Sequence, residues 1–219
     1  MLRSAAFFDI DGTLISCYSQ KILADEMRKR GLITLGQNLR LLTWFSLYKL
    51  GLIQSSEKIR RSVYRIFEKY DMVIIKNVFS DVIDIILKNY VRSEMKEVLL
   101  KHKAVGDQIY AISGTLSDLA IPICAHFGIA NCFGTTLEVK SDRYTGVWKG
   151  ALLEGVQKSC AMKELAQANG LDLASSYGYA DSYADLAMLE TVGHPFAVYP
   201  DDRLKEVAMQ RKWGIIDRA

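Results

Sequence analysis

The sequence predicts an α/β protein with a parallel sheet core, an inserted all-helical segment and a small β-hairpin. Short apolar runs alternate with helical patterns in the second half of the chain, which is typical of a parallel sheet covered by helices on both faces. Residues 17–90 carry helical periodicity alone. Residues 137–148 place a turn-rich centre between two half-apolar arms, which favours a hairpin.

The expected elements follow from these patterns in chain order. The apolar runs that predict strands are SAAFF (4–8), QIYAI (108–112), SSYGYA (175–180) and PFAVY (195–199). Helical patterns lie between or after them, at 115–127, 157–169, 183–192 and 201–211. We therefore predict a core domain made of residues 1–16 and 91–219, with a helical domain, residues 17–90, inserted after the first strand.

The most hydrophobic stretch of the chain is LRLLTWFSLYKLGLI, residues 39–53. It is too short to span a bilayer and it carries Arg40 and Lys49. We interpret it as a buried helix of the insertion, with an interfacial membrane helix as the alternative.

The composition is that of an ordinary globular protein. Of the 219 residues, 50% are hydrophobic and 24% are charged. The net charge of +3 and the lack of a dense Lys/Arg block argue against nucleic acid as a partner. The acidic residue Asp9 comes too early in the chain to leave room for the apolar region of a signal peptide, so we expect none. The four cysteines are Cys17, Cys124, Cys132 and Cys160. They are scattered and form no CxxC motif, which is typical of proteins in a reducing compartment, so we expect a cytoplasmic protein.

Acidic residues follow two of the predicted strands. Asp9 and Asp11 end the first strand, and Asp181 ends the strand at 175–180, with Asp185 four residues later. Ligands of a parallel sheet bind at the carboxyl ends of the strands, so these carboxylates are expected to share one edge. Clustered carboxylates suit Mg²⁺, and the cation would offset the repulsion between Asp9 and Asp11.

Anion-binding groups are predicted at the same edge. Ser113 and Gly114 follow the strand at 108–112, where a helix start would supply N–H groups to an anion. Lys158 opens the helical stretch at 157–169 and can neutralise a phosphoryl oxygen. Each feature alone has an ordinary explanation, such as a surface loop, a helix cap or a solvated lysine. Together, in this order, they indicate a site for a phosphate monoester with Mg²⁺.

Four motifs of this sequence resemble those of the haloacid dehalogenase superfamily of phosphohydrolases. They are FFDIDGTL (7–14), AISGT (111–115), Lys158 in EGVQKSCAMKELA, and YADSYADLAML (179–189). The resemblance covers essentially the whole chain, and the helical insertion is similar to the C1 cap of the phosphoserine-phosphatase-like branch, subfamily IB. The stretches RYTG (143–146) and 193–216 look like bacterial members of that branch. The resemblance implies a Rossmann-like core and a phosphomonoesterase activity on a small phosphorylated substrate.

The resemblance also implies roles for the acidic residues. Asp9 would be the nucleophile that forms an aspartyl-phosphate. Asp11 would protonate the leaving alcohol and later activate water. The Asp9 carboxylate, the Asp11 backbone carbonyl and Asp181 would hold Mg²⁺.

The remaining motif residues would bind the phosphoryl group or support those that do. Ser113 and the Gly114 N–H would hold phosphoryl oxygens, and Lys158 would neutralise the nucleophile and the transferring group. Asp185 would orient Lys158 or a metal-bound water.

The cap departs from the phosphoserine-phosphatase pattern at one position. Seven residues after Asp11, where that family carries a glutamate for the substrate ammonium, this sequence has Tyr18. Tyr18 supplies no carboxylate, which argues against phosphoserine as the substrate. Arg61, with its neighbour Arg60, is a candidate contact for a substrate anion, and an exposed helix arginine is the alternative. The apolar stretch 39–53 is a candidate lining for a less polar leaving group.

Other functions remain open from the sequence. A phosphotransferase or phosphomutase would use the same aspartyl-phosphate. A phosphoacceptor signalling domain also places Asp, Ser/Thr and Lys around Mg²⁺, although its motif order and insertion differ. A non-catalytic helical interaction protein would have little reason to keep these polar groups together. We predict no membrane partner, and the oligomeric state stays open.

Overall fold

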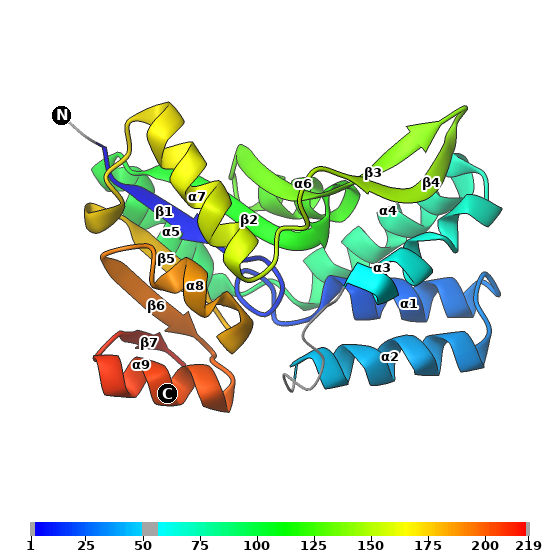
Figure 1. Cartoon of the computed structure of the whole chain (residues 1–219), viewed down its shortest axis with the longest axis horizontal. Coiled ribbons are helices and arrows are strands. Elements are labelled where there is room, and N and C mark those ends of the chain that lie inside the picture. The colour runs from blue at the N-terminus through cyan, green and yellow to red at the C-terminus, as the bar shows by residue number, and fades with distance from the viewer. Residues whose placement is uncertain (1–2, 50–56, 218–219) are drawn as a thin grey trace.

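The computed structural model describes residues 3–49 and 57–217, and within them one sheet of seven strands forms the centre of the molecule (Figure 1). The strand order is β4-β3-β2-β1-β5-β6-β7. All neighbouring strands pair in parallel except β3 and β4, which form an antiparallel hairpin. The strands are β1 Ala5–Phe8, β2 Gln108–Leu116, β3 Asn131–Lys140, β4 Arg143–Lys149, β5 Tyr177–Ala180, β6 His194–Val198 and β7 Gly214–Ile216.

Strand β1 lies at the middle of the sheet and is buried on both faces. Phe7 points to one face, where it packs in a cluster with Met162 and Met188. Phe8 points to the other face and joins a cluster that contains Met95. A strand covered on both faces must be apolar throughout, which is why this element appears in the sequence as a continuous apolar run.

Helices cover both faces of the sheet, as the alternation of elements predicts. Figure 1 shows α7 and α8 in front of the strands, with α5 and α6 behind them. The α/β fold class predicted from the sequence is therefore confirmed. The core helices are α5 Ser93–Val105, α6 Ser117–His126, α7 Val156–Asn169, α8 Leu186–Leu189 and α9 Asp202–Arg211.

The segment between β1 and β2 begins with helices that gather at one end of the molecule (Figure 1). One continuous apolar cluster joins this segment to the sheet, since it contains Met27 and Phe67 together with Phe8 and Ile123. The domain limits at 16/17 and 90/91 stay a prediction. The elements of the segment are α1 Ser19–Lys29, α2 Leu35–Lys49, α3 Glu57–Tyr64, the 3-10 turn Phe67–Lys69 and α4 Met72–Asn89.

The apolar stretch 39–53 is less buried than expected where the structure describes it. Leu39 is 63% exposed, whereas Leu41 packs against the main apolar cluster. Helix α2 thus lies on the surface of the helical segment with one side turned inward, and residues 50–53 fall outside the described part of the chain. No helix in the described ranges combines the length and the apolar character that crossing a bilayer requires.

Three local predictions differ from the structure, and one strand has no counterpart among the predictions. Strand β2 continues past 112 to Leu116, with an irregular register between Ile112 and Leu116. The first half of β3, residues 131–135, pairs with β2, and only its second half, residues 136–140, belongs to the predicted hairpin with β4. Strand β7 is too short, at three residues, to give a periodic signal. The stretch 183–192 forms a 3-10 turn and the four-residue helix α8.

The structure confirms the hairpin that the sequence predicts at residues 137–148. Ser141 and Asp142 link β3 to β4 with φ angles of 47° and 56°. Two consecutive positive φ values are typical of the two-residue turns whose twist matches that of the flanking strands.

Candidate active site

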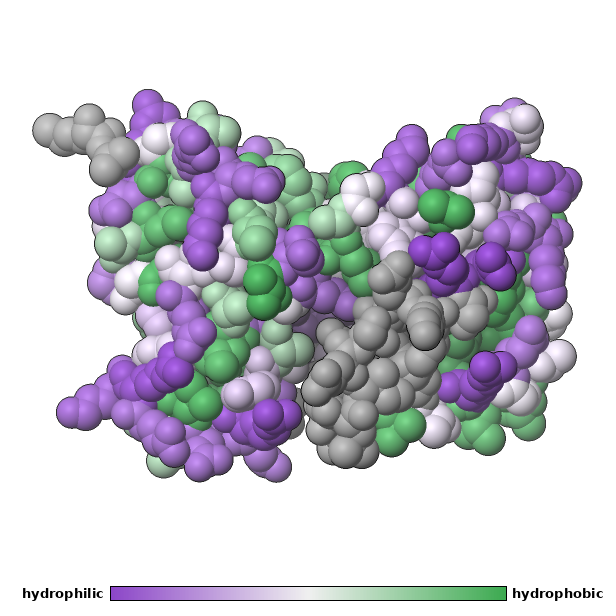
Figure 2. Space-filling view, in the orientation of Figure 1, coloured by the Kyte–Doolittle hydropathy of each residue, from purple (hydrophilic) through white to green (hydrophobic). Residues whose placement is uncertain are grey.

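Polar side chains gather in one cavity at the carboxyl ends of β1 and β5. Figure 2 shows the molecule hollowed between the core and the helical segment, with hydrophilic side chains at the centre. We call the space lined by these side chains the catalytic cavity. Apart from Arg61, all the site residues predicted from the sequence line it: Asp9, Asp11, Tyr18, Ser113, Gly114, Lys158, Asp181 and Asp185.

Lys158 bridges two carboxylates at the floor of the catalytic cavity. Its Nζ donates to Oδ1 of Asp9 at 2.7 Å and lies 2.8 Å from Oδ1 of Asp185. Burial disfavours the charged ammonium, but the Asp185 and Asp9 carboxylates outweigh this effect and hold the pKa of Lys158 above its ordinary value. The lysine therefore stays charged beside Asp9 across the physiological pH range.

Asp11 sits in a different electrostatic environment from Asp9, although only one residue separates them. Burial, and then the charge of Asp9, raise the pKa of Asp11 to about 6. Ser19 donates to its Oδ2 at 2.8 Å, while its Oδ1 is buried and has no partner among the described residues. A carboxyl group with a raised pKa and a free oxygen is suited to general acid–base catalysis.

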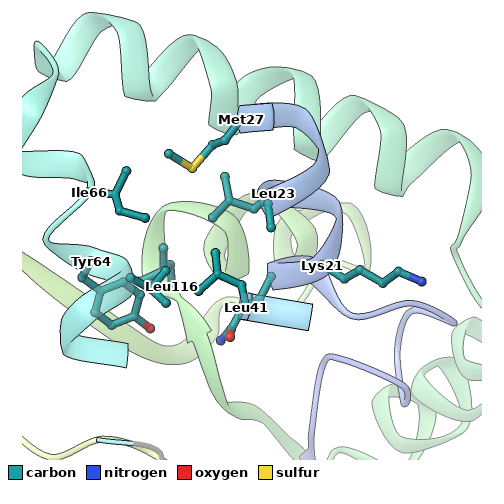
Figure 3. A pocket seen from close by; sticks show the side chains of 10 residues that line it. Lys21, Leu23, Met27, Leu41, Tyr64, Ile66 and Leu116 are labelled. Carbon is teal, nitrogen blue, oxygen red and sulfur yellow. The ribbon is translucent and has the colours of Figure 1, made fainter. Parts of the chain in front are cut away.

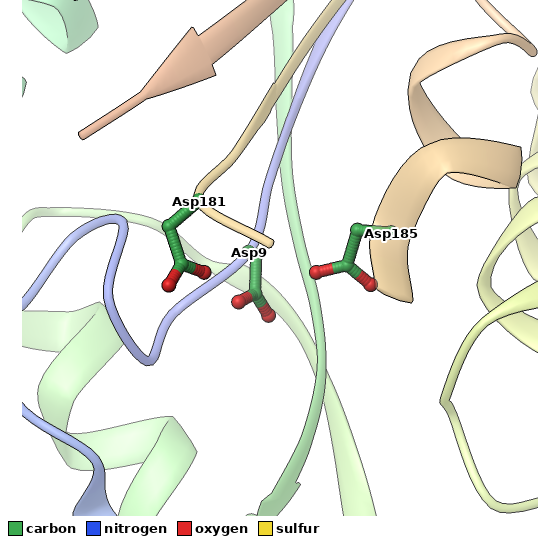
Figure 4. Close-up of side chains that lie close together, drawn as sticks. All are labelled: Asp9, Asp181 and Asp185. Carbon is green, nitrogen blue, oxygen red and sulfur yellow. The ribbon is translucent and has the colours of Figure 1, made fainter. Parts of the chain in front are cut away.

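Three buried carboxylates form a candidate metal site. Figure 4 shows Asp9 after β1, Asp181 after β5 and Asp185 before α8, with their carboxylates close together. One oxygen from each lies within 4.8 Å of the others. Oxygen donors at this spacing fit a hard divalent cation such as Mg²⁺, and Asp11, whose buried Oδ1 has no partner among the described residues, lines the same cavity.

The turn after β1, which carries the FFDIDGTL motif (7–14), is built around the Asp181 carboxylate. Gly12 has φ +84°, and a Cβ at this position would overlap the carboxylate of Asp181. Tyr18 donates from its hydroxyl to Oδ2 of Asp181 at 3.0 Å, so this predicted substrate contact is also a partner of a candidate metal ligand. Glycine is needed at residue 12 both for the backbone angle and for the space.

We therefore expect Gly12→Ala to lower kcat/KM by about 10²-fold, because misplacing a catalytic group by about 1 Å has an effect of this size. Gly31→Ala is the matched control, since Gly31 also has a positive φ, 69°, but nothing lies within 4 Å of its would-be Cβ. Steady-state hydrolysis of an aryl phosphate and thermal unfolding of both variants check this prediction. Equal activity in the two variants would contradict it.

Ser113 lies within β2 rather than at a helix start. Its buried hydroxyl donates to Oγ1 of Thr115 at 3.1 Å and accepts from the Thr115 N–H. Helix α6 begins only at Ser117, so the expected helix N-terminus directly after Ser113 is wrong. The register irregularity of β2 instead turns Ser113, Gly114 and Thr115 toward the catalytic cavity.

Of the two candidate arginines, the structure brings Arg60 and not Arg61 to the cavity. Arg60 is 6% exposed, and its Nη1 donates to the Gly114 carbonyl and to the Tyr64 hydroxyl, both at 3.0 Å. It also pairs with Glu154. Arg61 is exposed and its guanidinium stands 5.4 Å from the Trp148 ring centroid. Burial distinguishes the two arginines, because Arg60 shares the inward face of α3 with the buried Tyr64.

Several residues of the site carry no sequence signal. Ser19 and Glu154 reach the cavity residues only through the tertiary fold. Arg92, at the return from the helical segment, donates from its Nε to the Gly12 carbonyl at 3.2 Å and lies over the Tyr199 ring at 3.6 Å. Arg92 therefore connects the turn after β1, at Gly12, to the loop after β6.

Comparisons with known proteins agree with this geometry. The family model of haloacid dehalogenase-like hydrolases matches residues 6–190. Phosphoserine phosphatase SerB1 of Mycobacterium tuberculosis is 30% identical over 219 residues, which cover 99% of this chain and 71% of that protein. The histidinol-phosphatase of Neisseria meningitidis serogroup C is 31% identical over 229 residues, covering 99% of each chain.

A solved structure shows the same fold. The crystal structure of a protein of unknown function from Bordetella pertussis Tohama I superposes with a TM-score of 0.87 at 26% identity, covering 99% of each chain. Family model, relatives and fold thus agree with the resemblance seen in the motifs. The chain belongs to the haloacid dehalogenase-like hydrolases, as a phosphoserine-phosphatase-like member of that family.

Proposed function

We propose that this protein is a Mg²⁺-dependent phosphatase that hydrolyses a small phosphate monoester through an aspartyl-phosphate on Asp9. The observation that carries the proposal is the buried Lys158 bridge, which holds the Asp9 carboxylate at the end of the central strand, beside Asp11 with its raised pKa. The SerB1 and histidinol-phosphatase relatives both act, by their names, on small phosphate monoesters, which supports this substrate class.

In the first half of the reaction, an Asp9 oxygen attacks phosphorus and the bond from phosphorus to the ester oxygen breaks. Protonated Asp11 gives its proton to the departing alcohol oxygen. Lys158 offsets the negative charge that the phosphoryl group brings next to Asp9. The Ser113 hydroxyl and the Gly114 N–H hold the phosphoryl oxygens.

In the second half, a water molecule attacks the phosphorus of the aspartyl-phosphate. Asp11, now a carboxylate, takes a proton from this water. The bond from phosphorus to the Asp9 oxygen breaks, which releases phosphate and restores both aspartates to their starting states.

The side chains present fit a divalent cation. The Asp9 carboxylate, the Asp181 carboxylate and the Asp11 backbone carbonyl would hold Mg²⁺, while Asp185 keeps Lys158 in place through its 2.8 Å contact. When bound, Mg²⁺ supplies Lewis-acid charge stabilisation for the phosphoryl oxygens.

Removal of the metal tests the proposal. We expect hydrolysis of 4-nitrophenyl phosphate to fall to background in excess EDTA and to return when Mg²⁺ is added back. Asp181→Asn is expected to raise the Mg²⁺ concentration for half-maximal activity at least about tenfold, because it removes one charged ligand. Unchanged activity after chelation would overturn the metal requirement.

We also propose a cytoplasmic location for this protein. Cys17 and Cys124 are buried, Cys132 is half-buried and Cys160 is exposed, and all four are free thiols. Free thiols are typical of a reducing compartment, which supports the proposal.

A further inference from the structure

A second cavity lies between α1, α2, α3 and the end of β2. Figure 3 shows its side chains, with Leu23, Met27, Leu41 and Ile66 converging on a common space and Lys21 pointing away from it. We call this space the apolar chamber, and its apolar lining consists chiefly of Leu23, Met27, Leu41, Val63, Ile66 and Leu116.

The apolar chamber adjoins the catalytic cavity. Gln20 lines both spaces. Thr115 lines the catalytic cavity, and the next residue, Leu116, lines the chamber. The Tyr64 side chain lines the chamber, while its hydroxyl accepts from Arg60 in the wall of the catalytic cavity. The two spaces therefore share a wall at Gln20.

The boundary between the two spaces carries little free charge. The charge of Arg60 is met by Glu154, and its other bonds go to the Gly114 carbonyl and the Tyr64 hydroxyl. Tyr18 contributes a neutral hydroxyl to the wall of the catalytic cavity and donates it to Asp181. These contacts favour an uncharged group at the boundary, because a charged one would be desolvated against apolar walls.

We infer that the apolar chamber binds the carbon chain of the leaving alcohol, so that the substrates are phosphate monoesters of uncharged alcohols with a hydrocarbon chain. This inference rests on the proposed function. The phosphoryl group lies at Asp9, the ester oxygen faces Asp11, and the chain passes Gln20 between α1 and α3. Lining residues such as Leu23, at 4% exposure, and Leu116, at 0%, are already withdrawn from water, and a carbon chain in the chamber would gain dispersion contacts with its apolar lining.

The first test is a series of straight-chain alkyl phosphates from ethyl to octyl, used below their micelle-forming concentrations with Mg²⁺. Each methylene that enters the chamber should raise kcat/KM about fourfold, the factor that corresponds to burying one CH₂ group. The rise should stop when the chamber is full. Phosphoserine and histidinol phosphate serve as polar comparators and should fall below octyl phosphate. A flat or falling series, or a polar comparator above all alkyl phosphates, would overturn the inference.

Variants that fill the chamber test whether the dependence of kcat/KM on chain length arises there. Ala24, which also lines it, is 6% exposed, so Ala24→Leu fills the space from α1. Val63→Phe fills it from α3 and changes a half-buried position, which keeps the test valid if Ala24→Leu folds poorly. Either variant should lower the octyl-to-ethyl ratio of kcat/KM at least about tenfold, the effect of losing two methylenes. The control is Val73→Leu on the exposed face of α4, which should keep the native ratio. If both filling variants keep the native octyl-to-ethyl ratio of kcat/KM, the inference that the chamber binds the carbon chain is refuted.

Binding of the matching alkyl phosphonates separates this inference from the proposed function. These compounds are not hydrolysed, and their affinity is measured by calorimetry. If affinity rises with chain length but no phosphate ester is hydrolysed, the proposed function is overturned and binding of a carbon chain in the chamber is supported. If phosphate esters are hydrolysed but neither rate nor affinity depends on chain length, the chamber inference is overturned and the proposed function is supported. If the protein neither hydrolyses phosphate esters nor binds the phosphonates, both the proposed function and the chamber inference are overturned.

Discussion

Asp9→Asn is expected to lower kcat/KM for aryl phosphate hydrolysis at least about 10³-fold, because the variant lacks the attacking carboxylate. The substitution keeps the shape of the side chain at the end of β1. Lys158 retains its contact with Asp185, so the fold should survive. Steady-state kinetics with Mg²⁺, beside thermal unfolding, measure the two effects separately.

The matched control for this prediction is Asp84→Asn. Asp84 is exposed on α4, outside the catalytic cavity, and its substitution makes the same change of charge and shape. We expect native kcat/KM in this control. Native-like activity in Asp9→Asn would contradict the assignment of the nucleophile.

Lys158→Met is expected to affect both activity and stability. Loss of the cation beside Asp9 should lower kcat at least about 10²-fold, since preorganised charge stabilisation is removed. The buried carboxylates of Asp9 and Asp185 would lose their shared partner, and breaking a buried ion pair in this way costs about 3–5 kcal/mol. Chemical unfolding in EDTA measures the stability without a cation that could replace the lysine charge.

A double variant separates the two effects of this substitution. Lys158→Met combined with Asp185→Leu removes one of the uncompensated carboxylates and should recover part of the lost stability, but none of the activity. Lys163→Met, at an exposed position of the same helix α7, controls for the loss of a lysine. Full activity in the double variant would show that Lys158 acts only on the fold.

Much of the core could be predicted because its signals are local. Strand β1 is buried on both faces and therefore forms an unbroken apolar run that ends at Asp9. The carboxyl ends of parallel strands meet at one edge, and this rule predicts from the sequence that Asp181 and Asp9 lie close together.

The parts that escaped prediction depend on tertiary contacts. The irregular register that turns Ser113 toward the cavity arises where β2 pairs with β3, and no local pattern encodes it. Arg92 supports the Gly12 carbonyl from 80 residues away in the chain. Ser19 is only eight residues from Asp11, but it reaches that carboxylate from the start of α1, across the turn that follows β1. The choice between Arg60 and Arg61 needed the direction of the α3 face, which Tyr64 sets.

The assignment of Asp9 as the nucleophile is tested by trapping the phosphorylated enzyme with the Asp11→Asn variant. 4-Nitrophenyl phosphate has a good leaving group that does not depend on an acid, so Asp9 can still be phosphorylated, while the missing base slows attack by water. Acid quenching followed by peptide mass spectrometry should find the phosphoryl group on Asp9 in nearly every molecule. Phosphate on another residue, or turnover by the native enzyme with no phosphoaspartate in either protein, would contradict the assignment of Asp9 as the nucleophile.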